Sequence, residues 1–472
     1  MLRAAALRRG LSTSQGKRVV VVDGARIPFA MAGTKYKDQM AVDLMRYALR
    51  GLLTKTALPA HEVDYVLCGT VVQEPRTSNI AREAAMHAGL PHDIPAHTVS
   101  LACVSANAAI CQGAEKILAG ASSASHGAAM PSRHRRDSCP SDLTEMLRAG
   151  QADVVIAGGC ETFSDVPIRY SRPIRKRLLG AQKAMKKGPA GALSLLKGLK
   201  LKDLAPEAPS IKNFTTDEVM GHSSDRLATK FGVSREEQDK FTLRSHQNAQ
   251  QAHDSGIYAD ELVPGVEGDA DLHENGIKAQ STPEQLAKLK PAFVKNGAGT
   301  HTAANSSFLT DGAAATLIMS ESKALELGYT PKAYLNNWTF AAVDPFEEML
   351  LGPTYATAKV LDMAQVSLDE IDVVEFHEAF AGQVLANFNA MKSDEFAREK
   401  LGRDSAVGTM KMDRVNPHGG SLSLGHPFGA TGARLVTTAA NRLQREGGKL
   451  ALVAACADGG VGHACVLERY PQ

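Results

Sequence analysis

Two cysteines, far apart in the 472-residue chain, stand in settings that suit a reactive thiol. Cys103 follows a short apolar run and precedes an Ala-rich helical pattern, so we expect it at a helix N-terminus. There, unpaired backbone N–H groups and the positive end of the helix dipole would lower the pKa of the thiol. Cys456 follows a second apolar run and precedes Gly459 and Gly460. These two residues are the candidates for nucleophilic and proton-transfer chemistry.

The remaining cysteines fit a simpler interpretation, because a lone cysteine is more often a small buried hydrophobe than a nucleophile. Seven cysteines without a CxxC pair or a regular spacing argue against a disulfide scaffold and a zinc ribbon. This pattern favours a reducing compartment and predicts no metal site. Four of them lie in apolar or helical patterns: Cys68, Cys111, Cys160 and Cys465.

Two histidines supply further acid–base candidates. His426 stands in a glycine-rich turn, whose glycines let the backbone approach a ligand closely. The turn lacks the GK[ST] ending of a P-loop and the spacing of a dinucleotide fingerprint, so phosphate binding is a weak alternative. His377 follows an apolar run at residues 371–376. Since α/β sheets gather their sites at the carboxyl ends of strands, we expect these histidines and both cysteines to share one pocket.

Short apolar runs alternate with helical patterns along the chain. Four consecutive valines at residues 19–22 predict a strand that is covered on both faces. Helical patterns at 41–53 and 79–88 alternate with strand patterns at 65–68 and 154–157. The alternation predicts a layered α/β architecture, and the length suits two or three domains.

The second half of the sequence echoes the first. Residues 62–66 resemble residues 370–374, and each segment leads into a strand and then a loop. Residues 152–159 are similarly matched by an apolar run at 450–455 that precedes two glycines. These echoes predict two similar α/β halves.

Two segments interrupt this pattern. Residues 121–150 are small, polar and basic, and indicate either an extruded surface loop or an error in the gene model. Residues 169–202 hold eleven Lys or Arg and no acid, interleaved with leucines. Such a composition is typical of an interfacial helix on anionic lipid, and the alternatives are a docking surface for another protein or a solvated excursion.

The first 18 residues contain five basic residues, and no acid precedes Asp23. They predict a mitochondrial transit peptide over residues 1–17, cleaved between Arg9 and Lys17; the alternative is a basic tail without an address. No run reaches the roughly 18 apolar residues of a spanning helix. A net charge of +2 gives no case for nucleic-acid binding.

Taken together, four elements in this order resemble the thiolase family. They are the segment around Cys103, His-Glu-Ala-Phe at 377–380, Gly-His-Pro-x-Gly-x-x-Gly at 425–432, and Cys-x-x-Gly-Gly at 456–460. The resemblance implies duplicated α/β halves in a layered αβαβα core with an inserted loop domain. It assigns residues 18–164 plus 300–330 to the N-terminal half, 165–299 to the loop domain and 331–472 to the C-terminal half.

The resemblance also implies a reaction, the thiolysis of a 3-ketoacyl-CoA by CoA. Cys103 would be the nucleophile that carries the acyl group, His426 would activate it, and Cys456 would donate and accept protons. His377 and His426 would form one oxyanion hole, and the backbone N–H groups of Cys103 and Asp458 a second. CoA is thus a substrate, and no cofactor is implied. Its implied contacts are Met220, Ala303, Ser307, Ala379 and Phe380.

Some positions leave alternatives open. Most thiolases carry Asn where this chain has His377, and a small residue, often Gly, at position 458. The Asp458 carboxylate would weaken the oxyanion hole if it pointed inward, so we expect either that it faces away or that turnover is reduced. Asn305 and Asp311 are expected to fix loop geometry or bind CoA, and Phe380 to bind CoA or lie in the core.

His377, the basic segment and the N-terminus favour a degradative enzyme of mitochondrial long-chain fatty-acid β-oxidation. The alternatives are a biosynthetic acetyl-transferring thiolase and a catalytically silent lipid-binding scaffold. The resemblance implies a homodimeric core, a larger hydratase/dehydrogenase α subunit as partner, and peripheral contact with cardiolipin on the matrix side of the inner membrane.

Overall fold

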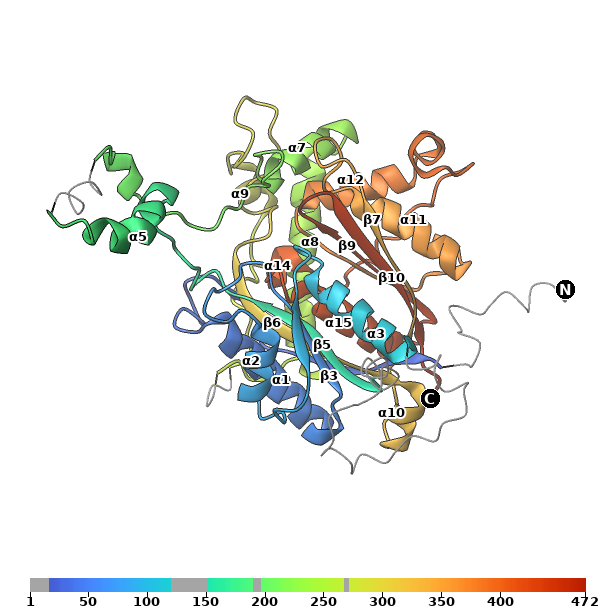
Figure 1. Ribbon diagram of the computed structural model, residues 1–472. Helices are drawn as coiled ribbons and strands as arrows, with labels where there is room; N and C mark the ends of the chain where they lie inside the picture. Colours follow the sequence, from blue (N-terminus) through green and yellow to red (C-terminus); the bar gives the residue numbers. More distant parts are fainter. Residues whose placement is uncertain (1–16, 120–151, 190–196, 267–270) are drawn as a thin grey trace.

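A continuous path of strands runs through the molecule. The computed structural model describes residues 17–119, 152–189, 197–266 and 271–472 (Figure 1). β2 (Ala30–Met31) pairs with β6 beside the main path. In spatial order the path is β4 (Ala96–Val99), β3 (Tyr65–Gly69), β5 (Val154–Glu161), β6 (Thr310–Ser320), β1 (Val19–Arg26), β7 (Ala333–Ala342), β10 (Val461–Arg469), β9 (Leu450–Ala457) and β8 (Val373–Phe376).

The two ends of this path repeat one topology. In the first half, β3 is parallel to β5, and β5 and β1 are both antiparallel to β6. In the second half, β8 is parallel to β9, and β9 and β7 are both antiparallel to β10. The order β3-β5-β6-β1 therefore matches β8-β9-β10-β7, with β4 added to the first half. The predicted duplication is confirmed.

A pair of aspartates explains the sequence echo physically. The Asp64 carboxylate accepts the backbone N–H groups of Asp153 and Val154 at 2.9 and 3.0 Å, where β5 begins. Asp372 accepts the N–H groups of Lys449 and Leu450 in the same way, where β9 begins. Each aspartate supplies a partner for backbone donors at the end of a ladder, where the sheet itself offers none.

Helices form three layers around the two halves of the sheet (Figure 1). Helices α3 (Ser105–Ala119) and α15 (Thr431–Glu446) lie between the halves, and α15 contacts strands of both. α1 (Ala41–Thr56) and α2 (Ile80–His87) cover the outer face of the first half. α11 (Gly352–Ala364) and α12 (Ala381–Met391) cover that of the second. The αβαβα layering is confirmed.

Small residues let the central layer pack closely. The Ala-rich pattern that follows Cys103 does form α3, and its alanines except the terminal Ala119 are buried. A Cβ atom added at Gly113 would lie only 2.9 Å from Ile318 Cδ1 and 3.0 Å from Val155 Cγ1. The helix thus approaches the strands more closely than larger side chains would permit.

The chain between β5 and β6 forms α7 (Met220–Lys230), α8 (Arg235–Asp254) and α9 (Pro283–Ala287) above the core, and α5 (Arg172–Met185) projects away from it (Figure 1). None of the helices in the described ranges has the length and hydrophobicity of a membrane span. The shorter elements are η1 (Ala60–Glu62), η3 (Leu201–Leu204), η4 (Ile257–Asp260), α10 (Glu321–Glu326), η5 (Leu368–Glu370), α13 (Asp394–Phe396), η6 (Ala397–Leu401) and α14 (Ser421–Leu424).

Parts of the predicted segments lie outside the described residues. These are residues 1–16 of the transit peptide, the whole insertion at 121–150, and residues 190–196 of the basic segment. Lys17, the last residue of the predicted transit peptide, is described, and its Nζ pairs with the Asp153 carboxylate at 2.8 Å.

Candidate active site

The predicted residues converge on one cavity of about 430 Å³. Two of its walls come from the carboxyl ends of β4 and β9, as the sequence predicted. Ala303 is exposed and His377 is fully buried, and neither is among the lining residues that the structure describes. Eight predicted residues line it: Cys103, Met220, Ser307, Ala379, Phe380, His426, Cys456 and Asp458.

Cys103 lies at a tight bend between β4 and α3. The preceding residue, Ala102, has a φ of 44°, in the left-handed region that non-glycine residues rarely adopt. Ser105 closes the bend, because its Oγ donates to the Ala102 carbonyl and accepts the Leu101 N–H. The bend places Cys103 in the wall of the cavity, two residues before the helix.

The sequence-based expectation of a lowered thiol pKa is wrong. Burial, together with the charges of the nearby Asp458 and Glu161 carboxylates, raises the pKa of Cys103 to about 12. The backbone N–H groups of Asp458 and of Cys103 itself act in the opposite direction. The cost of desolvating a thiolate outweighs the helix N-terminus here, so Cys103 is a neutral thiol in the free protein.

Cys456, at the end of β9, is almost fully buried. Burial raises the pKa of the Cys456 thiol well above the ordinary value. The neighbouring Cys103 adds to this effect, because two thiolates side by side would repel each other. A thiol held protonated beside a second thiol is suited to give a proton to a carbanion and to recover one later.

His426 is oriented by two threonines. Its backbone N–H donates to Thr310 Oγ1 at 2.9 Å, and its Nδ1 lies 2.6 Å from Thr431 Oγ1. Since the Thr431 hydroxyl donates to the Pro427 carbonyl, it accepts from Nδ1–H, which leaves Nε2 as the unprotonated nitrogen. Among the described residues, Nε2 has no hydrogen-bond partner. Burial and Arg434 lower the pKa of His426 to about 3, so it enters the reaction as a free base.

His377 lies beside His426, with ring centroids 4.1 Å apart. Its Nδ1 is 3.1 Å from Ser421 Oγ, and its Nε2 has no partner among the described residues. Burial, His426 and Arg434 lower the pKa of His377 well below its usual range. Two neutral imidazoles therefore present unpaired Nε2 atoms in one place. His377 Nε2 can donate to an oxyanion in the tautomer that carries its proton there, and His426 Nε2 can donate once it has taken up a proton.

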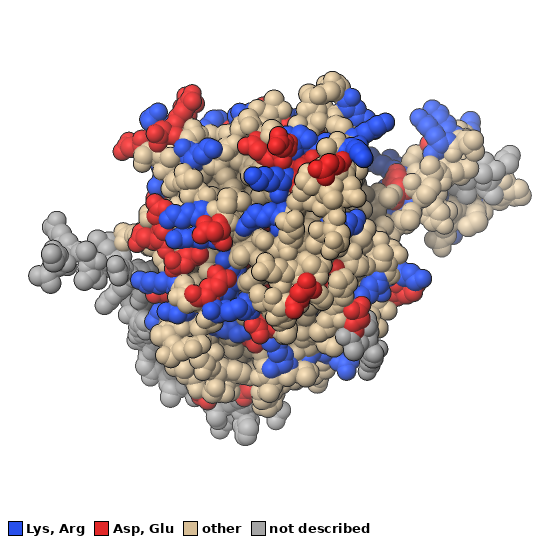
Figure 2. Space-filling model, turned by 180° about the vertical axis from the view of Figure 1, so that it is seen from behind, with Lys and Arg blue, Asp and Glu red and all other residues tan. Residues whose placement is uncertain are grey.

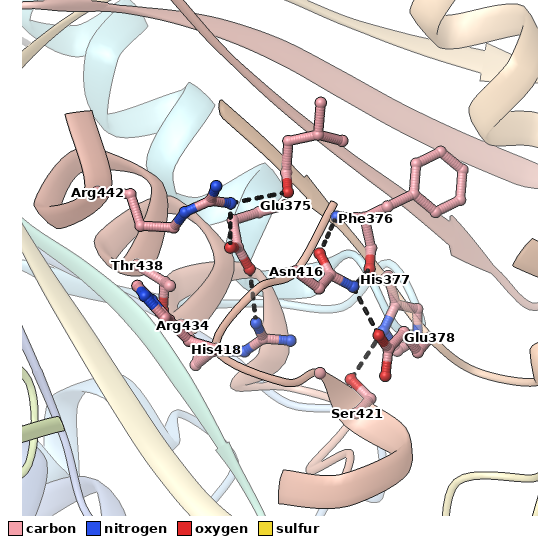
Figure 3. Close-up of polar contacts among 12 residues, drawn as sticks. Glu375, Phe376, His377, Glu378, Asn416, His418, Ser421, Arg434, Thr438 and Arg442 are labelled. Atoms are coloured by element: carbon pink, nitrogen blue, oxygen red, sulfur yellow. Dashed lines mark hydrogen bonds and ion pairs between the residues drawn. The ribbon is translucent and has the colours of Figure 1, made fainter. Parts of the chain in front are cut away.

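A buried polar network fixes the backbone that carries His377 (Figure 3). The Asn416 side chain exchanges hydrogen bonds with both backbone groups of Phe376, at 2.8 and 2.7 Å, and donates to Glu378 Oε1 at 2.7 Å. Glu378 also accepts the Ser245 hydroxyl at 2.7 Å. Sequence reasoning gave no role to Asn416, although it opens the same glycine-rich turn that carries His426.

Glu375, two residues before His377, lies between two arginines (Figure 3). Its carboxylate pairs with Arg434 Nη1 at 3.1 Å and with Arg442 Nη1 at 2.9 Å, and all three side chains are buried. Arg434 belongs to α15 and acts on both His377 and His426 by lowering their pKa values. The sequence offered no signal for this charge, because β8 and α15 are far apart in the chain.

Glu161 joins two loops at the edge of the cavity. This fully buried carboxylate accepts the backbone N–H groups of Val71 and Val72 at 3.1 and 2.9 Å and that of Gly429 at 3.1 Å. Phe428, next to Gly429, packs against the His426 ring at 4.8 Å. Burial raises the pKa of Glu161 to about 7 against the effect of these donors. Sequence reasoning missed this residue.

The Asp458 side chain has a partner outside its own loop. Its Oδ1 accepts the Asn213 amide at 2.7 Å and the Gly459 N–H at 2.8 Å. The carboxylate is thus tied to the segment before α7. Of the two expectations for Asp458, the one in which its side chain faces away from the oxyanion hole fits this geometry.

The surroundings of the predicted CoA contacts are well ordered by hydrogen bonds. Ser307 N–H donates to the Ala379 carbonyl at 2.9 Å, and Phe380 packs edge-on against Phe293 and lines the cavity.

Asn305 Oδ1 accepts the Thr302 N–H at 2.7 Å, and Asp311 Oδ1 accepts the Phe163 N–H at 2.7 Å. Both side chains are fully buried, so their geometry favours a role in fixing loops. In the described ranges, no group of His, Cys, Asp or Glu is arranged to hold a metal ion.

Comparison with known families gives two matches that cover most of the chain. The profile "Thiolase, N-terminal domain" matches residues 19–125 and 141–322, and "Thiolase, C-terminal domain" matches residues 329–469. The unmatched stretch, residues 126–140, falls inside the predicted insertion. The human mitochondrial trifunctional enzyme subunit beta is 51% identical over 468 residues, which are 98% of this chain and 91% of that protein.

Solved structures share the fold. Human mitochondrial 3-ketoacyl-CoA thiolase in complex with CoA superposes with a TM-score of 0.75 at 29% identity, covering 96% of this chain and 98% of that one. The Bacillus anthracis acetyl-CoA acetyltransferase gives the same TM-score and identity, with 96% and 99% coverage. The architecture is thus common to a protein named as a 3-ketoacyl-CoA thiolase and one named as an acetyl-CoA acetyltransferase.

Proposed function

Because this chain belongs to the thiolase family, we propose that it is a 3-ketoacyl-CoA thiolase of mitochondrial long-chain fatty-acid β-oxidation. It is an acetyl-CoA C-acyltransferase, which cleaves a 3-ketoacyl-CoA with CoA to acetyl-CoA and an acyl-CoA shortened by two carbons. The observation that carries the proposal is the meeting of Cys103, His426 and Cys456 in one cavity. Two neutral thiols and an unprotonated imidazole are the groups that this reaction needs.

The first half-reaction forms an acyl thioester on the protein. His426 Nε2 takes the proton from Cys103 as the sulfur attacks C3 of the 3-ketoacyl-CoA. The C2–C3 bond then breaks, and its electron pair passes to C2 as the enolate of acetyl-CoA. The Cys456 thiol protonates C2, and acetyl-CoA leaves.

The second half-reaction returns the protein to its starting state. The Cys456 thiolate takes the proton from the thiol of a second CoA, whose sulfur attacks the acyl carbon. Cys103 leaves as a thiolate and recovers its proton from His426. Two thiols are needed because one is occupied as a thioester while the other moves protons.

Preorganised donors stabilise the oxygens that become negative. The backbone N–H groups of Cys103 and Asp458 serve the oxygen on the attacked carbon, in keeping with their effect on the Cys103 thiol. His377 and His426 serve the thioester oxygen of the enolate. Their buried Nε2 atoms support this assignment. CoA is a substrate in this scheme, held by Met220, Ala303, Ser307, Ala379 and Phe380.

The proposal extends to the membrane surface. Helix α5 has no buried residue, and its Leu179 side chain is 86% exposed. Exposed leucines beside Lys and Arg are unfavourable in water alone and favourable at an anionic lipid surface. Seen from behind, Lys and Arg side chains stand out on the projecting lobe, whereas charges of both signs mix over the main body (Figure 2). Cardiolipin on the matrix side of the inner membrane is the proposed contact.

Partners and chain organisation follow the family. The human relative is named as a mitochondrial subunit beta, and we propose for this chain a homodimeric core paired with a hydratase/dehydrogenase α subunit. Residues 1–17 form the proposed transit peptide. The proposed domains are residues 18–164 with 300–330, residues 165–299, and residues 331–472.

The function is tested by CoA-dependent thiolysis of 3-ketohexadecanoyl-CoA and acetoacetyl-CoA, with the Cys103→Ala variant as control. We expect turnover of the long-chain substrate in the native protein and a loss of at least about 1000-fold in the variant. Turnover of acetoacetyl-CoA alone would favour the biosynthetic enzyme. Absence of both activities would favour a silent lipid-binding scaffold.

A further inference from the structure

One wall of the active-site cavity is a segment of the loop domain, residues 208–212, which we call the strap. All five of its residues line the cavity, and Ile211 is 64% exposed. Ala208 and Pro209 add further apolar surface. The strap therefore covers the cavity from outside and is not itself packed into a core.

Asn213 directly follows the strap, and its buried side-chain amide forms hydrogen bonds through both its oxygen and its nitrogen. Its Oδ1 accepts the backbone N–H groups of Thr215 and Thr216 at 2.9 and 3.0 Å, which fixes the turn that follows. Its Nδ2 donates to Asp458 Oδ1 at 2.7 Å. This amide connects the strap to the turn that follows Cys456 and β9.

Asp458 is at the other end of this connection and is also close to the chemistry. Its backbone N–H acts on the Cys103 thiol, while its carboxylate holds Asn213. A glycine, which is common at this position in the family, has no side chain to make such a bond. The hydrogen bond is therefore a property of this chain's own residues.

We propose that the Asn213–Asp458 hydrogen bond is a specificity determinant that holds the strap over the cavity as a wall for long acyl chains. This inference rests on the proposed thiolase function and names the substrate class that the strap selects. A long acyl chain gains apolar contact with the closed strap, because each buried methylene adds to binding. An acetoacetyl group is too short to need it.

The variant Asn213→Asp separates the two sides of the amide. An aspartate at this position still accepts the two N–H groups of the turn but offers no donor to Asp458, and two carboxylates then face each other. We expect KM for 3-ketohexadecanoyl-CoA to rise about tenfold with kcat nearly unchanged, and KM for acetoacetyl-CoA to stay within about twofold. The double variant Asn213→Asp/Asp458→Asn re-forms the bond with donor and acceptor exchanged, and should restore the long-chain KM.

A single variant that changes both substrates equally, or neither, would overturn the strap proposal, as would a double variant that fails to recover long-chain binding. Native protein that turns over only acetoacetyl-CoA would instead overturn the proposed function, and the strap's role with it. The native measurement thus separates the two failures.

Discussion

The proposed nucleophile, Cys103, and its proposed base, His426, are both uncharged in the free protein. Burial raises the pKa of Cys103 to about 12 and lowers that of His426 to about 3, so no thiolate–imidazolium pair forms in the free protein. Proton transfer must then accompany the attack on the substrate, at the moment when the oxyanion donors gain a negative oxygen to stabilise. In this scheme the thiol, the imidazole and the oxyanion donors are in position before the reaction, and their charges form only as the substrate is attacked.

Glu161 gives a test at the same scale. Its pKa of about 7 means that below pH 7 it is protonated and accepts fewer of the N–H groups of Val71, Val72 and Gly429. The loosened turn then places His426 less well. We expect kcat/KM of the native protein to fall from pH 8 to pH 6 with a midpoint near 7. In Glu161→Gln, kcat/KM should be about tenfold lower and flat over this range.

Glu161 interacts electrostatically with the Cys103 and Cys160 thiols, which stay neutral throughout this range because their pKa values are raised. Glu284→Gln, at an exposed carboxylate far from the cavity, is the matched control and should keep the native profile. Persistence of the acid limb in Glu161→Gln would contradict the assignment.

At the residue scale, residue type and order selected the candidate reactive groups but not their protonation states. Cys103 and Cys456 could be selected because each follows an apolar run, and His426 because it stands in a glycine-rich turn. Their pKa values depend on burial by elements far away in the chain, which no local pattern reports. The Asn213–Asp458 hydrogen bond joins residues 245 positions apart, and neither residue type predicts that the other is its partner.

At the scale of elements, the basic, leucine-containing sequence of α5 agrees with the exposed position of this helix. The basic segment predicted an interfacial helix, and residues Arg172–Met185 form an exposed helix that starts at a Ser171 cap and a proline. In the proposed membrane contact, its cations would bind anionic headgroups and its exposed leucines would supply the apolar contact. The sequence reported the composition of this helix but not its projection from the body.

Deletion of residues 175–200 tests this helix. Binding to phosphatidylcholine vesicles that contain cardiolipin should fall at least about fivefold in a flotation assay, while thiolysis of acetoacetyl-CoA stays within about twofold of native. Leu178→Ser/Leu179→Ser keeps every charge and should lose part of the binding. Native-like binding by the deletion variant would leave protein docking as the role of α5.

At the scale of the whole molecule, the two halves meet through backbone as well as side chains. β1 and β7 pair over Val20 and Val21, and the His426 turn of the second half rests on β5 of the first. A Cβ atom at Gly159 would overlap the Gly429 carbonyl and lie 2.7 Å from the Gly69 carbonyl oxygen. Glycine is needed here for close approach and not for an unusual φ.

The variant Gly159→Ala therefore tests the junction. We expect a loss of roughly 1–3 kcal/mol, or a drop in Tm of about 5 °C by differential scanning calorimetry, together with reduced thiolysis, because the added methyl group pushes the halves apart. Gly180→Ala, within the exposed helix α5, meets no atom within 4 Å and should leave Tm unchanged. Equal Tm values for both variants would show that the junction tolerates separation.

The sequence predicted the duplication, because the paired aspartates Asp64 and Asp372 repeat the same local task in both halves. It also predicted the α/β class, because strand and helix patterns alternate. It did not predict that α3 and α15 would share the central layer, since their contact depends on how the two halves stack.

The raised thiol pKa values have a consequence for survival in a respiring compartment. Hydrogen peroxide oxidises thiolates and reacts poorly with thiols. The raised pKa values keep Cys103 and Cys456 in the thiol form in the idle protein, which therefore offers little for peroxide to attack. The burial that raises the pKa of both thiols thereby protects them from oxidation to sulfenic and sulfinic acids between turnovers.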